Sequence, residues 1–276
     1  SKALTIAGTS TITLTNTETY TGSTTINSGA TLSLGDGTTA GTLNAASAIT
    51  DNGTLTFNAP TDVTYAGVLS GTGAVTKLGS NTLTLGNSSS NSTYSAGTTV
   101  SAGTLKAGYG HAPFGTGTVT VSSGASLDVA GQDLSNNLSL AGTGVGGYAL
   151  LNSSTTASTL SGAVSLADNS TIGGANPIKL SGVISGTSKA LTIAGTSTIT
   201  LTNTETYTGS TTINSGATLS LGDGTTAGTL NAASAITDNG TLTFNAPTDV
   251  TYAGVLSGTG AVTKLGSNTL TLGNSS

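Results

Sequence analysis

Side chains able to do acid–base or metal chemistry are few in this chain and widely separated along it. A glycan lyase or hydrolase requires acid and base groups within reach of one bond. The acidic residues before position 188 lie tens of residues apart for the most part: Glu18, Asp36, Asp51, Asp62, Asp128, Asp133 and Asp168. Three of them, Asp36, Asp51 and Asp168, stand beside Gly or Asn, which is typical of turns. The pattern favours turn-forming aspartates over a catalytic pair.

Other signatures of catalysis or ligand binding are equally weak. The single histidine, His111, lies in Gly110-His111-Ala112-Pro113-Phe114-Gly115 with no paired Ser or Cys motif nearby, so it is interpreted as a loop residue. Calcium-binding β-rolls repeat Gly-Gly-x-Gly-x-Asp, whereas Gly35-Asp36-Gly37 stands alone. Phosphate-binding loops need a following helix, and no helical pattern follows any Gly cluster. We therefore predict no catalytic residue, no metal site, no cofactor and no enzymatic activity.

The elements that position these residues are short β-strands. Apolar residues alternate with Thr or Ser, which is the period-two pattern of a strand with one buried face. Gly, Asn and Ser separate these runs and permit tight turns. The alternating runs include residues 11–15, 31–34, 54–57, 82–85, 118–121 and 126–129. The chain is predicted to be all-β, with Leu14, Leu34, Phe57, Leu85 and Val121 pointing inward.

An exact repeat organises the chain. Residues 1–89 recur without one substitution as residues 188–276. We therefore divide the chain into one complete repeat unit, 1–187, and the start of an identical second unit, 188–276, with no linker between them. Because the ends of natural repeat arrays carry atypical capping units, both ends are expected to be internal to a longer protein.

Short strands at this spacing fit either a row of β-sandwiches or a parallel β-solenoid. A sandwich core draws on large aromatic residues, but aromatics make up only 4% of this chain and Trp, Met and Cys are absent. A solenoid stacks its turns, or rungs, about 4.8 Å apart, and its thin core is filled by Leu, Ile and Val. The composition therefore predicts a parallel β-solenoid with rungs of roughly 20 residues.

Two segments share a further pattern. The first runs from Gly67-Val68-Leu69-Ser70-Gly71 through Tyr94 to Gly103-Thr104-Leu105, and the second from Gly182-Val183-Ile184-Ser185-Gly186 through Tyr207 to Gly216-Ala217-Thr218-Leu219. This pattern resembles the autotransporter-associated β-strand repeat, or passenger-associated transport repeat, of large bacterial surface proteins. The resemblance implies a right-handed β-helix passenger that is displayed outside a Gram-negative cell, often in adhesins and biofilm proteins. The sequence departs from the family pattern at Tyr20-Thr21-Gly22-Ser23, because the family usually has Tyr-Thr-Gly-Gly there.

The net charge and the Thr-x-Thr pairs of the sequence limit which binding partners are expected. The net charge is −5 and the six lysines are scattered, so neither nucleic acid nor an anionic membrane is an expected partner. No apolar run is long enough to span a bilayer as a helix. Stacked Thr-x-Thr pairs can bind ice when they recur at one place in many consecutive rungs. The irregular spacing of the pairs along the sequence argues against that function.

These observations predict a structural and adhesive extracellular protein, a β-helical cell-surface fibre acting in adhesion, biofilm or matrix. Its partners would be further identical repeat units end to end, and also like fibres, other cell surfaces or glycans. Repeated weak contacts on such a fibre add up as avidity. The alternative is a non-catalytic stalk that presents an enzyme or ligand-binding domain outside this segment.

Overall fold

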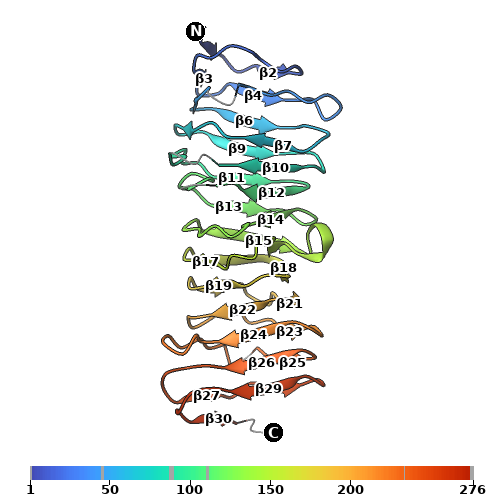
Figure 1. The fold of residues 1–276 in the computed structure, drawn as a ribbon, viewed down its shortest axis with the longest axis vertical. Helices are drawn as coiled ribbons and strands as arrows, with labels where there is room; N and C mark the ends of the chain where they lie inside the picture. Colours follow the sequence, from blue (N-terminus) through green and yellow to red (C-terminus); the bar gives the residue numbers. More distant parts are fainter. Residues whose placement is uncertain (1, 45–46, 87–89, 110–111, 233, 274–276) are drawn as a thin grey trace. The chain divides into compact units, whose positions relative to one another are not determined.

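The structure is a computed structural model that describes residues 2–44, 47–86, 90–109, 112–232 and 234–273. It divides into two compact units, Ser1–Asp128 and Val129–Ser276. Each unit consists of short parallel strands stacked rung upon rung, which confirms the predicted all-β parallel β-solenoid (Figure 1).

In the first unit the strands form three columns, and a rung contributes at most one strand to each column. The first column is β1-β3-β5-β8, the second β2-β4-β6-β9-β11-β13 and the third β7-β10-β12-β14, all paired in parallel. The strands are β1 Leu4–Ile6, β2 Thr11–Leu14, β3 Thr24–Ile26, β4 Thr31–Leu34, β5 Ile49–Asp51, β6 Thr54–Phe57, β7 Val63–Tyr65, β8 Leu69–Ser70, β9 Ala74–Lys77, β10 Thr82–Leu85, β11 Thr98–Val100, β12 Thr104–Ala107, β13 Val119–Val121 and β14 Ser126–Asp128.

The second unit has the same three-column plan. One column is β16-β18-β21-β23-β25-β28, another is β17-β19-β22-β24-β26-β29, and shorter ladders join β15, β18 and β20 and, separately, β27 and β30. Its elements are β15 Leu138–Gly142, the 3-10 helix η1 Val145–Gly147, β16 Leu150–Asn152, β17 Ser158–Leu160, β18 Val164–Gly174, β19 Ile178–Leu180, β20 Ile184–Ser185, β21 Leu191–Gly195, β22 Thr198–Leu201, β23 Thr211–Ile213, β24 Thr218–Leu221, β25 Ile236–Asp238, β26 Thr241–Phe244, β27 Val250–Tyr252, β28 Leu256–Ser257, β29 Ala261–Lys264 and β30 Leu270–Leu272.

The rungs differ in length because their turns differ. Hydrogen bonds between adjacent rungs join residues 20 apart, as from Thr72 to Asn52, 25 apart, as from Ser47 to Gly22, or 26 apart, as from Thr159 to Asp133. The extra residues lie in the turns, so the strands remain in register.

The core is one side chain deep and consists mainly of Leu, Ile and Val from the inward positions of the strands. Leu34, Phe57, Leu85 and Val121 are buried, as predicted. Leu14 is only half-buried, because β4 is the one strand that pairs with β2 among the residues that the structure describes. Burial in this architecture therefore depends on having a rung above and a rung below.

Tight corners between strands require glycine where the backbones of adjacent rungs touch. A Cβ atom on Gly41 would lie 1.8 Å from the carbonyl oxygen of Leu14. The identical corner in the second copy places a Cβ atom on Gly228 1.9 Å from the oxygen of Leu201. No side chain fits at that distance, so the glycines permit the close stacking of rungs.

Candidate functional site

The structure holds the acidic residues at separate places. Asp36 lies exposed in a turn, where its Oδ1 accepts hydrogen bonds from the backbone N–H groups of Thr38 at 2.8 Å and Thr39 at 2.6 Å. These bonds lower the pKa of Asp36. Among the described residues, no group of three His, Cys, Asp or Glu side chains is placed to hold a metal ion.

Two exposed aspartates join neighbouring rungs. Asp62 accepts a hydrogen bond from the N–H of Thr82 at 2.7 Å, and Asp133 accepts one from the N–H of Thr159 at 2.6 Å. Both bonds satisfy a backbone donor at or near the start of a strand in the next rung. These carboxylates therefore stabilise the stack.

Asp51 and Asp128 depart from the turn interpretation, because both lie at the ends of strands and are buried. Asp128 forms an ion pair with Lys106, at 3.7 Å between Nζ and Oδ2. Asp51 accepts a hydrogen bond from the N–H of Gly53 at 2.9 Å, while its Oδ2 has no hydrogen-bond partner. Burial raises the pKa of Asp51 to about 6.

Glu205 is a second buried carboxylate that sequence reasoning did not single out. Its Oε2 accepts a hydrogen bond from the backbone N–H of Ile184 in the preceding rung, and its Oε1 has no partner. Burial raises the pKa of Glu205 to about 7. Its copy in the first repeat, Glu18, is half-exposed, so the sequence around it carries no signal of this environment.

Lys77 is fully buried, which is rare for a lysine. Its Nζ donates to the carbonyl oxygens of Leu78, Gly79 and Ala102 and to Oδ1 of Asn81, at 2.9 to 3.2 Å. Desolvation by burial lowers the pKa of Lys77 to about 8. The bond to Ala102 crosses to the next rung, so this ammonium group joins two rungs from inside.

A tyrosine–threonine pair recurs at one kind of corner. The hydroxyl of Tyr94 lies 2.5 Å from Oγ1 of Thr98, and that of Tyr207 lies 2.6 Å from Oγ1 of Thr211. Both pairs are buried, and burial raises the pKa of both tyrosines above its usual value. The third pair joins Tyr20 to Thr24 at 2.7 Å. The sequence analysis did not single out these pairs, although the spacing Tyr-x-x-x-Thr recurs at all three.

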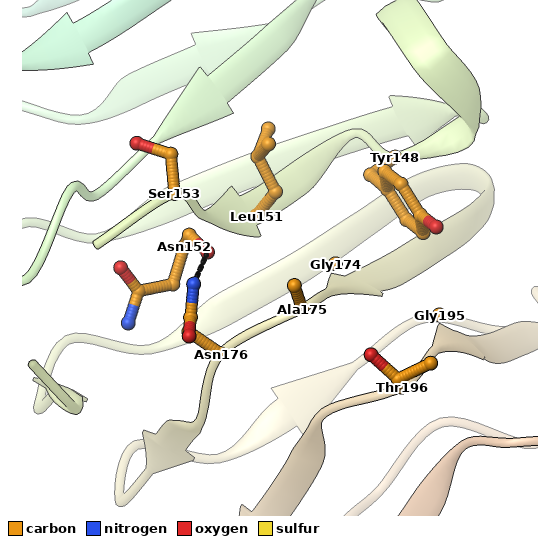
Figure 2. A pocket seen from close by; sticks show the side chains of 9 residues that line it. All are labelled: Tyr148, Leu151, Asn152, Ser153, Gly174, Ala175, Asn176, Gly195 and Thr196. Carbon is orange, nitrogen blue, oxygen red and sulfur yellow. Dashed lines mark hydrogen bonds between the residues drawn. The ribbon is translucent and has the colours of Figure 1, made fainter. Parts of the chain in front are cut away.

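A pocket of about 340 Å3 opens beside the ends of strands β16, β18 and β21 in the second unit (Figure 2). Its walls are the ring of Tyr148, the side chain of Leu151 and the backbone at Gly174 and Gly195. Its other lining residues are Asn152, Ser153, Ala175, Asn176 and Thr196. None of the nine carries a charge at neutral pH.

Asn152 is the most buried polar side chain of that pocket. Its amide nitrogen donates to the carbonyl oxygens of Thr156 at 2.8 Å and Pro177 at 2.9 Å. Its Oδ1 accepts from the N–H groups of Gly131 and Ser154. Because these bonds use the donors and acceptor of the amide, Asn152 holds the corner of the solenoid together.

The outward faces of the strands carry rows of hydroxyl groups, which the sequence predicted as exposed threonine. In the first unit one row follows the second column: Thr13, Ser33, Thr56, Thr76, Thr99 and Thr120 are paired in that order. His111, interpreted from sequence as a loop residue, lies outside the described residues. No described helix is long and apolar enough to cross a membrane.

Comparison with known families gives one match. The family model described as passenger-associated-transport-repeat matches residues 4–34, 75–107 and 191–221. Neither the curated proteins nor the solved structures yield a significant match.

Each matched segment holds four strands over two consecutive rungs, and the first strand pairs with the third and the second with the fourth. These pairings are β1–β3 and β2–β4, then β9–β11 and β10–β12, and finally β21–β23 and β22–β24. Each segment also contains one tyrosine–threonine pair. The predicted resemblance is thereby confirmed: the chain carries three passenger-associated-transport repeats, and its β-solenoid is autotransporter passenger-like.

Proposed function

We propose that this chain is a segment of a structural and adhesive extracellular fibre, in which identical repeats extend one solenoid outward from a bacterial surface. Passenger-associated-transport repeats imply a surface or secreted protein. The solenoid supplies length, since each rung adds about 4.8 Å. The repeated outward hydroxyl rows supply many weak contacts that add as avidity.

The observation that carries this proposal is the way the second copy begins. Its first strand, β21, pairs on one side with β18 of the preceding segment and on the other with β23. Its second strand, β22, likewise lies between β19 and β24. An identical repeat can therefore continue the solenoid without a cap.

Side chains reinforce this junction. Lys179 Nζ lies 2.6 Å from Oδ2 of Asp223, and Lys189 Nζ lies 3.1 Å from Oδ1 of Asp168. Lys179 and Asp168 precede the second copy, whereas Asp223 and Lys189 belong to it. Both ion pairs are partly exposed and screened by water, so each contributes little to stability. They favour this register of docking over others.

We propose further that the segment is not an enzyme and that further copies of itself are its end-to-end partners. The ionisable side chains described above each have a role within the stack, which supports this view. The alternative, a stalk that presents a distal enzyme or ligand-binding domain, requires the same stiffness but no adhesion by the repeats.

A copy-number series tests these two functions. Chains with one, two and four repeats would be displayed on a non-adherent bacterium, and fibre length by electron microscopy and adhesion by single-cell force measurement would be recorded. For an adhesive fibre we expect both length and adhesion to rise with copy number. A rise in length without adhesion would favour the stalk, and no rise in length would refute the fibre.

A further inference from the structure

Glu205 lies at the boundary between the first repeat unit and the second copy. It belongs to the second copy, whereas Ile184, whose backbone N–H donates to its Oε2, precedes that copy. Glu205 is buried, and its Oε1 has no hydrogen-bond partner among the described residues. A buried carboxyl group therefore joins two rungs through one of its oxygen atoms and leaves the other oxygen unsatisfied.

The segment that carries Glu205, residues 203–208, is held to the preceding rung by backbone hydrogen bonds. The N–H of Thr206 donates to the carbonyl oxygen of Ile184 at 2.9 Å, and the N–H of Thr208 donates to that of Gly186 at 3.1 Å. The segment lies outside the described strands. It can therefore detach locally while the strands on either side stay paired.

The corresponding corner of the first unit is capped by a neutral side chain. Ser92 lies two positions before the tyrosine of its tyrosine–threonine pair, as Glu205 does. Ser92 is buried, and its Oγ accepts a hydrogen bond from the backbone N–H of Leu69 at 3.3 Å. An equivalent backbone donor is thus capped by a hydroxyl group in one corner and by a carboxyl group in the other. Capping alone does not require an ionisable side chain.

The two protonation states of Glu205 differ in the cost of burial. A protonated carboxyl group keeps an oxygen that accepts a hydrogen bond, so the bond from Ile184 is available in both states. A buried carboxylate without a counter-ion is strongly disfavoured. Water outside the stack removes that cost. Ionisation therefore favours the conformation in which the side chain has left the interior.

Among the described residues, the groups around Glu205 supply no positive charge that could pair with it. Tyr207, on the same segment, is neutral at pH 7, because burial raises its pKa. The turn after the preceding rung carries Lys189, whose Nζ is paired with Asp168 at 3.1 Å. The following rung faces the segment with residues 229–231, which do not ionise. Burial accordingly dominates, and the pKa of Glu205 is about 7.

We propose that Glu205 is a pH-sensitive latch at the boundary between successive repeats. When its carboxyl group is protonated, it holds residues 203–208 against the preceding rung, and when the group ionises, the segment detaches. Each further identical copy would bring the same glutamate against the same preceding rung, so an array would carry one latch in every repeat. The latch is a property of the chain itself and does not depend on adhesion.

The test is amide hydrogen exchange at Ile184 in the 276-residue chain, measured by NMR at pH 6 and pH 8 and corrected for the pH dependence of intrinsic exchange. The pKa of Glu205 is about 7 when the segment is docked and about 4.3 when it is exposed to water. Linkage then raises the opening constant roughly tenfold over this range. We therefore expect the protection of the Ile184 amide to fall about tenfold.

Two neutral substitutions distinguish the latch from a purely structural contact. Glu205→Gln keeps an acceptor for the N–H of Ile184 at every pH. Glu205→Ser introduces the side chain that caps the equivalent corner at Ser92. In either variant the protection of the Ile184 amide should be the same at both pH values. The matched control Glu18→Gln, at the half-exposed copy of this residue, should retain the tenfold fall.

Circular dichroism would show whether the variants fold. If Glu205→Ser fails to fold, Glu205→Gln decides, because it is closest to the natural side chain in size. Equal protection of the Ile184 amide at pH 6 and pH 8 in the wild-type chain would overturn the proposal. So would a tenfold fall that persists in folded Glu205→Gln, or an equal loss of protection throughout the second unit, which would show global unfolding in place of local release.

Discussion

Residues 1–89 and 188–276 have one sequence but two environments. Ile12 of the first copy is 42% exposed, whereas the identical Ile199 of the second copy is fully buried. Within the described part of the chain, the strand that holds Ile12, β2, pairs only with β4, whereas the strand that holds Ile199, β22, lies between β19 and β24. Because Ile12 and Ile199 have the same neighbours in sequence, the presence of a preceding rung accounts for the difference in their burial.

The reverse difference appears at the other end of the repeated segment. Leu85 is 1% exposed, because β10 lies between β7 and β12. Its copy Leu272 is 52% exposed, because β27 is the one described strand that pairs with β30. Complete burial of such a side chain is worth about 1.5–3 kcal/mol. Each rung thus supplies much of the stability of its neighbours.

Identical substitutions at the two copies should measure this directly. Leu85→Ala should lower the free energy of unfolding by about 2–5 kcal/mol, because it leaves a cavity in the core. Leu272→Ala should change it by no more than about 0.5 kcal/mol. Urea unfolding followed by circular dichroism gives both values. Equal losses at the two sites would contradict the dependence of burial on neighbouring rungs.

Glu205 and its copy Glu18 should differ in how they make the free energy of unfolding depend on pH. The pKa of Glu205 is about 7 in the folded protein, above its ordinary value, so folding favours the protonated form. The stability that it contributes is present below about pH 4.3 and is lost as the pH rises through 7. Between these limits the loss approaches about 1.4 kcal/mol for each pH unit.

Glu205→Gln should reduce this pH dependence, and Glu18→Gln should not, because Glu18 is half-exposed. Thermal melting from pH 4 to pH 8 would check it. Part of the dependence should remain in both variants, since the pKa of Asp51 is also raised by burial. An unchanged pH profile in Glu205→Gln would show that this carboxylate is not the source.

Substitution of Lys77 and of its copy Lys264 should give a smaller difference in the free energy of unfolding. Lys77→Met removes the donor that serves four acceptors in two rungs, and should cost about 1.5–3 kcal/mol. The copy of this residue, Lys264, is exposed and donates only to the carbonyl oxygen of Gly266 among the bonds described. Lys264→Met should therefore leave the urea midpoint nearly unchanged. A similar shift in both variants would refute an inter-rung role for Lys77.

The smallest expected effect concerns the tyrosine–threonine pairs. Tyr207→Phe removes one partner of a buried hydrogen bond to Thr211, at a cost of about 1–3 kcal/mol. Tyr20→Phe should cost less, because Tyr20 is half-exposed and water can replace the bond to Thr24. Hydrogen exchange at the two corners would compare them. A larger loss of protection at Tyr20 would contradict this ranking.

The candidate sites were less predictable than the fold. The tyrosine–threonine pairs were not predicted, although the recurring spacing Tyr-x-x-x-Thr could have marked them in the sequence. No local signal distinguished Glu205 from Glu18 or Lys77 from Lys264, because each pair has identical neighbours over most of the repeat. Their different burial arises from strands that are distant in sequence.

The sequence by itself determined which residues form strands and which of their side chains face inward, because a strand places alternate side chains on opposite faces. That is why Leu34 and Phe57 could be assigned to the core. The sequence also sufficed to recognise the passenger-associated-transport repeats, because their motif spans two consecutive rungs. Only the tertiary structure decided which strands become neighbours, because rungs of 20 and 25 residues close onto the same register through turns of different length. Thr56 and Thr76 thereby lie side by side in one row of hydroxyls.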